Sequence, residues 1–291
     1  MTPTFFTFAS SKFFAGAMAL FRAVQFAFPT APFILLPGDV GNAACRHAAR
    51  CGVRVHPVEN VKIWPDGDPR NVGASRYSVE QIPGEYLVYV DADAFMTAHI
   101  ALLLEVPSGK IGVVSERYLT RYGREYTVGD QFDPGADLDR CDQYGTSARQ
   151  PSFNCGVLAG ERQAWLDLTQ AIREVAAAEP ELTNHARSDQ GLFALAACSR
   201  QLVHELPENC NLYDEYWDGA SAAILHFEGY DRPWVYGPPR KDNSYPAFKA
   251  WRHFSRMSDF AFSGDWYKEL IWRPLDDLRP LKRRLAGMLH S

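Results

Sequence analysis

Apolar runs of strand length alternate with stretches of helical character from the first residues of this chain. A β-prone run at 4–8 is followed by a helical stretch at 13–28 and by a second apolar run at 31–36. A helical stretch at 40–51 and a strand at 53–58 continue the pattern. Because parallel strands need a crossover connection, usually a helix, the alternation favours parallel pairing. We therefore expect an α/β fold with a mostly parallel central sheet flanked by helices.

The composition is that of a compact globular chain without structural cross-links. The chain has 291 residues, of which 46% are hydrophobic and 22% are charged. A chain of this length buries about three quarters of its unfolded surface, so it needs neither disulfides nor a metal to stay folded. Its six cysteines show no C-x-x-C spacing. That pattern argues against a structural zinc site or a redox pair and favours a reducing compartment.

Charge divides the chain into an acidic body and a basic tail. Residues 1–231 contain 18 Lys and Arg against 29 Asp and Glu, whereas residues 232–291 contain 12 against 6. A protein that binds a nucleic-acid duplex needs a broader basic face, so nucleic acid is not expected as a partner. We expect a main domain at 1–236 and a basic, aromatic-rich extension with helical character at 237–291, packed on that domain.

One long apolar stretch requires comparison with a membrane segment. Residues 13–38 contain a single charged side chain, Arg22, but Pro29, Pro32 and Pro37 interrupt them and no basic segment precedes them. A membrane-spanning helix or a signal peptide fits this pattern poorly. We expect a cytoplasmic protein.

The basic tail contains leucines at helical spacing. They recur every three or four residues, and basic residues fill the positions between them; the leucines are Leu275, Leu278, Leu281, Leu285 and Leu289, and the basic residues are Arg279, Lys282, Arg283 and Arg284. Such a helix can lie on the anionic inner face of a membrane, which would give a peripheral contact. It can equally pack on its own domain, and Pro280 must either begin the helix or kink it.

Two acidic residues follow the most apolar strand of the chain. The run 86–90 leads directly into Asp91-Ala92-Asp93, whereas the other Asp-x-Asp sequences, at 66–68 and 137–139, lie in polar stretches. Ligands of open α/β sheets sit beyond the carboxyl ends of strands, and paired carboxylates there can hold a divalent cation against a diphosphate. The alternative is a solvated turn that caps a helix.

A histidine ends another apolar strand, at 223–227. His226 is followed by Gly229 and Arg232. An imidazole nitrogen added to two carboxylates favours manganese, because Mg²⁺ prefers oxygen ligands throughout. Gly229 would let the backbone approach a phosphate, and Arg232 could donate to its oxygens. The alternative is a core histidine beside a Pro-Trp corner.

A long polar stretch separates the two halves of the expected sheet. Residues 115–152 exceed the length of an ordinary connection, and such loops are usually lids or binding loops. Strand 153–158 and helices at 165–178 and 188–198 follow it. Together with the aromatic and acidic run 213–217, the loop is the expected place for a sugar or other acceptor, although aromatic residues in loops more often pack.

These segments occur in the order of a known family and cover residues 4–234. The matching segments are 7–10 (Thr-Phe-Ala-Ser), 89–93 (Tyr-Val-Asp-Ala-Asp), 153–157 (Phe-Asn-Cys-Gly-Val), Asp189-Gln190, Leu206-Pro207 with Asn211, and His226-x-x-Gly229-x-x-Arg232-Pro233-Trp234. The chain resembles the retaining GT-A glycosyltransferases of the glycogenin and bacterial lipopolysaccharide galactosyltransferase family, glycosyltransferase family 8. The resemblance implies a GT-A catalytic domain that transfers a hexose from a nucleotide-diphospho-sugar, such as a UDP-sugar.

The resemblance also implies roles for single residues. The metal ligands would be Asp91, Asp93 and His226, binding Mn²⁺ or Mg²⁺ between the two phosphates. The catalytic residues would be Asp189, Gln190 and Arg232. The donor would contact the motif residues and their neighbours: Phe8, Ala9, Ser10, Arg76, Asp91, Ala92, Asp93, Asn154, Gly156, Gly229 and Arg232. Simpler readings stay open for some of them: Arg76 as a surface arginine, Asn154 and Gly156 as a turn, and Asp189 as a helix cap.

Two positions depart from the family pattern. The family usually has an acidic residue after the first strand, where this chain has Ser10-Ser11-Lys12, and Arg232 replaces the usual lysine. The nucleotide, the sugar and the acceptor, which could be a glycan, a protein or a lipid-linked sugar, therefore stay open. A second class of function is a non-catalytic protein that binds a nucleotide sugar or glycan on a degenerate transferase fold. A nucleotidyltransferase is disfavoured, because no Gly-rich phosphate loop lies near the N-terminus.

Overall fold

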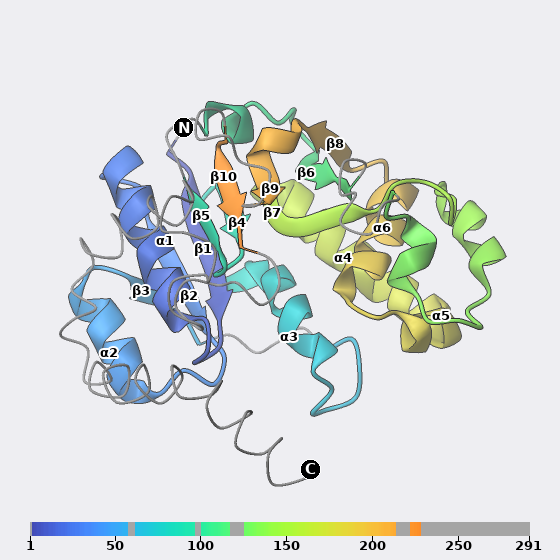
Figure 1. The fold of residues 1–291 in the computed structure, drawn as a ribbon, viewed down its shortest axis with the longest axis horizontal. Helices are drawn as coiled ribbons and strands as arrows, with labels where there is room; N and C mark the ends of the chain where they lie inside the picture. The colour runs from blue at the N-terminus through green and yellow to red at the C-terminus, as the bar shows by residue number, and fades with distance from the viewer. Residues whose placement is uncertain (1, 58–61, 97–99, 117–124, 214–221, 228–291) are drawn as a thin grey trace, which may run out of the picture.

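A twisted sheet of seven strands forms the centre of the molecule (Figure 1). The computed structural model describes residues 2–57, 62–96, 100–116, 125–213 and 222–227. The strand order is β3-β2-β1-β4-β7-β6-β8. These strands are β1 (Thr4–Ala9), β2 (Phe33–Pro37), β3 (Arg54–Val55), β4 (Tyr86–Val90), β6 (Ile111–Ser115), β7 (Phe153–Glu161) and β8 (Val203–Leu206). All neighbours pair in parallel except β7, which is antiparallel to both β4 and β6.

A second, smaller sheet has three strands in the order β5-β10-β9. They are β5 (Ala94–Met96), β9 (Leu212–Tyr213) and β10 (Ile224–His226). β10 is antiparallel to β5 and parallel to β9. Three residues, 91–93, separate the end of β4 from the start of β5, so the chain passes from the large sheet to the small one through them.

Two apolar cores lie on opposite faces of the large sheet. α1 (Phe14–Ala27) and α2 (Asn42–Arg50) contribute to the core that includes Phe5 and Val88. α4 (Arg162–Ala178), α6 (Asp189–Ser199) and the last residue of α3 (Arg70–Ala74) contribute to the core that includes Phe6 and Leu87. Successive strand residues point to opposite faces, so β4 is buried on both sides and is apolar throughout. Figure 1 shows α1 and α2 at one end of the molecule and α4, α6 and the short α5 (Pro180–His185) at the other.

The predicted α/β class and the mostly parallel sheet are confirmed, with some differences in the elements. The strand predicted at 53–58 is shorter in the structure, where β3 spans Arg54–Val55. The described part of 115–152 contains short 3₁₀ helices at Val128–Gln131 and Leu138–Tyr144. Within the described ranges, no helix is long and apolar enough to cross a membrane. The expected extension at 237–291 lies outside the described residues.

Candidate active site

The carboxylates of Asp91 and Asp93 lie where the two sheets meet. The Asp91 amide donates to the carbonyl of Gly156 at 2.7 Å, which holds the start of the turn against β7. In the small sheet, Ala94 on β5 pairs with His226 on β10. The Phe227 amide donates to the carbonyl of Asp93 at 2.8 Å and closes the same corner. This pairing brings His226 beside two aspartates that are far from it in sequence.

The three side chains form a group that can hold a metal ion. His226 Nε2 lies 3.3 Å from Asp93 Oδ1 and 3.9 Å from Asp91 Oδ2. One ligand atom from each residue lies within 4.8 Å of the others. Asp93 is 8% exposed and His226 is 5% exposed. Two carboxylates and one imidazole, largely buried from solvent, are a donor set that suits a divalent cation such as manganese.

Burial makes the charged form of Asp91 costly in the protein alone. Desolvation raises the pKa of Asp91, and the nearby charge of Asp93 acts in the same direction, whereas the Arg76 guanidinium opposes both. A cation between the carboxylates would favour their ionised forms. The reading of Asp91-Ala92-Asp93 as a solvated helix cap is therefore wrong: Asp93 is buried, and the segment leads into β5 instead of a helix.

Asp91, Asp93 and His226 are called the metal corner below. Arg76 connects this corner to α6. Its guanidinium lies 3.1 Å from Asp189 Oδ2 through Nε and 3.7 Å from Asp91 Oδ1 through Nη1. It donates to the carbonyls of Cys155 and Gly73. Arg76 is only 7% exposed, so its reading as a surface arginine is wrong. Burial works against its charge, but the carboxylates of Asp189 and Asp91 outweigh that effect and raise the pKa of Arg76.

Asp189 faces the site from the first turn of α6. The Tyr77 hydroxyl donates to its Oδ2 at 3.0 Å, and only 3% of the residue is exposed. The N-cap of α6 is Ser188, whose side chain accepts a hydrogen bond from the Gln190 amide. The reading of Asp189 as a helix cap is therefore wrong. Gln190 follows on the same turn, and its Oε1 is buried without a hydrogen-bond partner among the described residues.

A hollow of about 170 Å³ opens beside the metal corner. Most of the residues that the sequence placed near a donor line it, together with four that it did not. The predicted ones are Phe8, Ser10, Arg76, Asp91, Ala92 and Asp93, and the additional ones are Phe13, Val72, Gly73 and Tyr89. Ala9 belongs instead to the core beneath β1. The structure thus brings the ends of β1 and β4 together with the segment after α3.

Asn154 and Gly156 lie on β7, behind the metal corner, and not in a turn. The Gly156 amide donates to Asn154 Oδ1 at 2.8 Å, and Asn154 Nδ2 donates to the Tyr213 hydroxyl at 2.7 Å. Buried Asn211 and Glu116 also contact Asn154. The sequence did not assign Tyr77 or Tyr89 to the site, because a phenol beside an apolar run carries no spacing signal. Glu116 and Tyr213 were expected only as members of the acceptor segments 115–152 and 213–217.

Asp39, which follows β2, holds the segment after β1 where the family's usual acid is missing. Asp39 accepts hydrogen bonds from the Ser11 amide at 2.6 Å and from its hydroxyl at 3.0 Å. These bonds hold the segment that carries Ser10 and Phe13, two residues of the hollow. The predicted donor residues Gly229 and Arg232, and most of the aromatic run 213–217, lie outside the described residues.

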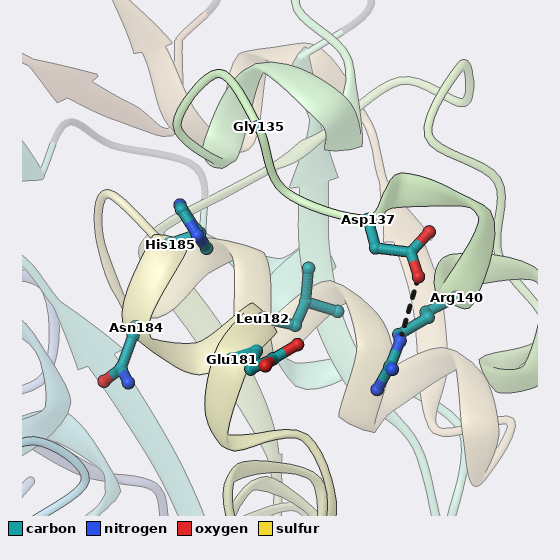
Figure 2. Close-up of a pocket in the computed structure, with 7 residues that line it drawn as sticks. All are labelled: Gly135, Asp137, Arg140, Glu181, Leu182, Asn184 and His185. Atoms are coloured by element: carbon teal, nitrogen blue, oxygen red, sulfur yellow. Dashed lines mark hydrogen bonds and ion pairs between the residues drawn. The ribbon is translucent and has the colours of Figure 1, made fainter.

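A second hollow, of about 310 Å³, lies between α5 and the 3₁₀ segment at Leu138–Tyr144 (Figure 2). Its lining mixes both charges and contains Asp137, Arg140, Glu181 and His185. Arg140 lies 3.1 Å from Asp137 and also pairs with Glu179. None of the residues around this hollow belongs to the predicted site.

Among the comparisons with known proteins, the solved structures show the fold. No family model and no curated protein sequence matches the chain. Among solved structures, galactosyltransferase LgtC in complex with donor and acceptor sugar analogues is 15% identical, with a TM-score of 0.61 over 91% of this chain and 99% of that one. The bifunctional glycosyltransferase WbbM is 13% identical, with a TM-score of 0.63 over 94% of this chain and 51% of that one.

A third similar structure is glycosyltransferase GlyE from Streptococcus pneumoniae TIGR4. It is 14% identical, with a TM-score of 0.57 over 93% of this chain and 64% of that one. The present chain therefore spans about half of WbbM and nearly two thirds of GlyE, but almost all of LgtC. It has the fold of these glycosyltransferases, and the expected GT-A architecture is confirmed.

Proposed function

We propose that this protein is a metal-dependent glycosyltransferase that moves a hexose from a nucleotide-diphospho-sugar, most simply a UDP-sugar, to an acceptor. The observation that carries the proposal is the group of Asp91, Asp93 and His226 at the edge of a hollow. Its position at the end of a central strand is where open α/β sheets bind ligands. The fold shared with LgtC, whose structure holds donor and acceptor sugar analogues, supports the same substrate class.

The residues present fit a bound Mn²⁺, with Mg²⁺ as the second choice. Asp91, Asp93 and His226 would hold the ion, which when bound would neutralise negative charge on the departing diphosphate. Arg76 would keep the two sides of the hollow together, because its guanidinium reaches both Asp91 and Asp189. Arg232 and Gly229 would contact the diphosphate, with Arg232 adding fixed positive charge.

The reaction would proceed with retention at the transferred sugar, as the family resemblance implies. Asp189 and Gln190 would face the reacting side of that sugar from α6. The carboxylate of Asp189 already pairs with Arg76 and accepts a hydrogen bond from Tyr77. These contacts fix its orientation, which suits electrostatic stabilisation better than nucleophilic attack. The acceptor would be a glycan, a lipid-linked sugar or a protein.

A panel of nucleotide sugars tests the proposal without knowledge of the acceptor. We expect one donor to be hydrolysed slowly in Mn²⁺, with release of free nucleoside diphosphate and no pyrophosphate. Excess chelator should abolish the reaction, and Mn²⁺ should restore it better than Ca²⁺. Asp93→Asn is the matched control, since it removes one ligand charge at constant size. Full activity in chelator would contradict the metal assignment.

The same panel distinguishes a non-catalytic binding protein. Such a protein would be stabilised against heat by one nucleotide sugar in Mn²⁺, because a ligand that binds only the folded state raises Tm. It would release no nucleoside diphosphate under any condition. Release of pyrophosphate would instead indicate a nucleotidyltransferase.

A further inference from the structure

Three buried side chains connect β7 to the metal corner through hydrogen bonds. Asn154 lies on β7, Asn211 ends the 3₁₀ segment Glu208–Asn211, and His226 ends β10. Their exposed fractions are 6%, 4% and 5%. Asn211 Nδ2 lies 2.8 Å from Asn154 Oδ1, and Asn211 Oδ1 lies 3.1 Å from His226 Nδ1. The row therefore ends on the imidazole whose other nitrogen faces Asp91 and Asp93.

The backbone of Gly156 sets the direction of every bond in this row. A backbone amide can only donate, so the Asn154 atom that it contacts at 2.8 Å must be the carbonyl oxygen Oδ1. The Asn211 atom that faces this oxygen must then be its NH₂ group. It follows that the carbonyl oxygen of Asn211 faces His226, and Nδ1 of His226 must carry a hydrogen to bond with it.

The remaining contacts of Asn154 agree with that direction. Its NH₂ group lies 2.7 Å from the Tyr213 hydroxyl and 3.3 Å from Glu116 Oε1, both of which can accept. All polar atoms of Asn154 thus have partners within the protein. Tyr213 also stacks on His226, with ring centroids 5.6 Å apart and an angle of 23° between the planes. This stacking contact restricts the movement of the His226 imidazole on one side.

We propose that Asn154 and Asn211 form a positioning relay that holds His226 in its Nδ1–H form and so presents the Nε2 lone pair to a cation bound by Asp91 and Asp93. A neutral imidazole that donates from one nitrogen can bind a metal only through the other. Partners of this kind orient metal-binding histidines and raise their basicity. The inference rests on the proposed metal-dependent function, and Asn154 and Asn211 act through His226 without contacting the ion.

Mn²⁺ affinity of the full chain, measured by electron paramagnetic resonance without any substrate, tests the relay. Asn211→Leu removes both hydrogen bonds at similar size and should weaken Mn²⁺ binding about 10- to 100-fold. Asn211→Asp keeps an oxygen that accepts from Nδ1–H but loses the bond to Asn154. It should therefore retain most of the affinity. Equal losses in the two variants would overturn the proposal, because the acceptor at position 211 would then not matter.

A double-mutant cycle separates the relay from a general loss of structure. In a His226→Ala background, Asn211→Leu should cause no further loss of Mn²⁺ affinity, because the relay acts only through the imidazole. A further loss of similar size would show that Asn211 supports the corner in another way and would reject the relay. Unchanged affinity in Asn211→Leu alone would also reject it.

The wild-type measurement keeps this failure distinct from failure of the proposed function. If the wild-type chain binds no Mn²⁺, the metal-dependent function fails and the relay fails with it. If wild type binds Mn²⁺ and Asp93→Asn does not, the metal site stands, and only the variants at position 211 decide the relay. Thermal unfolding of each variant verifies that the fold is present, and Asn211→Asp still decides if Asn211→Leu does not fold.

Discussion

Gly156 is the position at which the metal corner leaves no room for a side chain. A Cβ there would lie 2.6 Å from His226 Cε1 and 2.8 Å from Asn154 Oδ1. Both neighbours are buried and hydrogen-bonded, so neither can move freely. The Asn-x-Gly segment thus needs a glycine for a steric reason: His226 on β10 and Asn154 on β7 occupy the space that a side chain at position 156 would take.

We expect Gly156→Ala to displace His226. The variant should lose about 1–3 kcal/mol of unfolding free energy, as overpacking in a dense core does, and should bind Mn²⁺ at least 10-fold more weakly, as loss of ligand orientation does. Gly41→Ala is the matched control for Mn²⁺ binding, since nothing lies within 4 Å of its Cβ position. It should leave the Mn²⁺ affinity unchanged, although as the N-cap of α2 it can itself lose about 1 kcal/mol of stability. Urea unfolding and Mn²⁺ titration measure both effects. An alanine at position 156 without consequence would contradict the crowded corner.

Arg76 is the positive charge that pairs with buried Asp189 and with half-buried Asp91. Removing one partner of a buried pair leaves an uncompensated charge and costs about 3–5 kcal/mol. We expect Arg76→Leu to lose stability in that range, since it leaves both Asp189 and Asp91 without the guanidinium. Adding Asp189→Asn should recover part of the loss, with a coupling above about 1 kcal/mol.

Urea unfolding of the single and double variants measures that coupling. Gln163→Ala is a suitable control, because its side chain makes an exposed contact with Asp167 and should change stability by less than about 0.5 kcal/mol. Strictly additive effects of Arg76→Leu and Asp189→Asn would show that the two side chains do not support each other.

At this scale the sequence predicted the charged residues and missed the groups that orient them. Asp91, Asp93 and His226 stand out because charge after an apolar strand is unusual. Tyr89 donates to Asp91, yet it occupies an ordinary apolar strand position and looks like a core residue. Which acid Tyr89 can reach depends on the face of β4 to which its side chain points. Only the folded arrangement of strands shows which phenols and amides meet the acids.

Among the elements, length decided what could be predicted. β4 is an uninterrupted apolar run and α4 is 17 residues long, and both were predicted near their observed bounds. β3 and β9 each contain two residues, too few for any periodic pattern. The antiparallel direction of β7 was not predicted, because a strand buried on both faces has the same apolar sequence in either direction. That direction sets Gly156 beside Asp91.

The segment between β1 and α1 provides a prediction of pH dependence. The amide and hydroxyl of Ser11 hydrogen-bond to Asp39 and hold the pKa of that carboxyl below its usual value, the amide contributing most. A carboxyl group with a lowered pKa stabilises the folded protein at pH values above its unfolded-state pKa, which is about 3.9. This stability is lost as the pH falls through the lower folded-state value.

Asp39→Asn should therefore lower Tm at pH 6, and its effect should shrink as the pH falls through the lowered folded-state pKa of Asp39. The loss should stay below about 1 kcal/mol, because water screens this exposed group. Thermal melts of both proteins from pH 6 downward measure the difference. Asp139→Asn, a change at an exposed acid, serves as the control at each pH. A Tm difference independent of pH would assign the effect to packing and not to charge.

For the whole molecule, the site is a product of topology. Its residues come from β4, β7, β10, α6 and the segment after α3, which are distributed over most of the described chain. The sequence placed Asp91, Asp93 and His226 at the ends of strands, and the family resemblance supplied the other site residues. The distances among them follow from how two sheets join at residues 91–93, which no local pattern encodes.

The basic tail at 232–291 lies outside the described residues, and its sequence provides the last prediction. Leucines at 275, 278, 281, 285 and 289 would form one face of a helix, and the basic residues between them would face anionic headgroups. Each Lys or Arg near an anionic surface contributes about 1 kcal/mol at low salt, and screening removes much of it. We propose that this tail brings the protein to an anionic membrane that carries a lipid-linked acceptor of the proposed reaction.

Sedimentation with vesicles distinguishes this role from packing of the tail on its own domain. The full chain should sediment with anionic vesicles at low salt and be released at high salt, and it should stay in the supernatant with neutral vesicles. A chain that ends at Arg273 should stay in the supernatant throughout, while its thermal stability and Mn²⁺ affinity stay those of the full chain. A tail that packs on the domain would give the opposite pattern: neither chain would sediment, and truncation would lower Tm because apolar surface that the leucines covered would meet water.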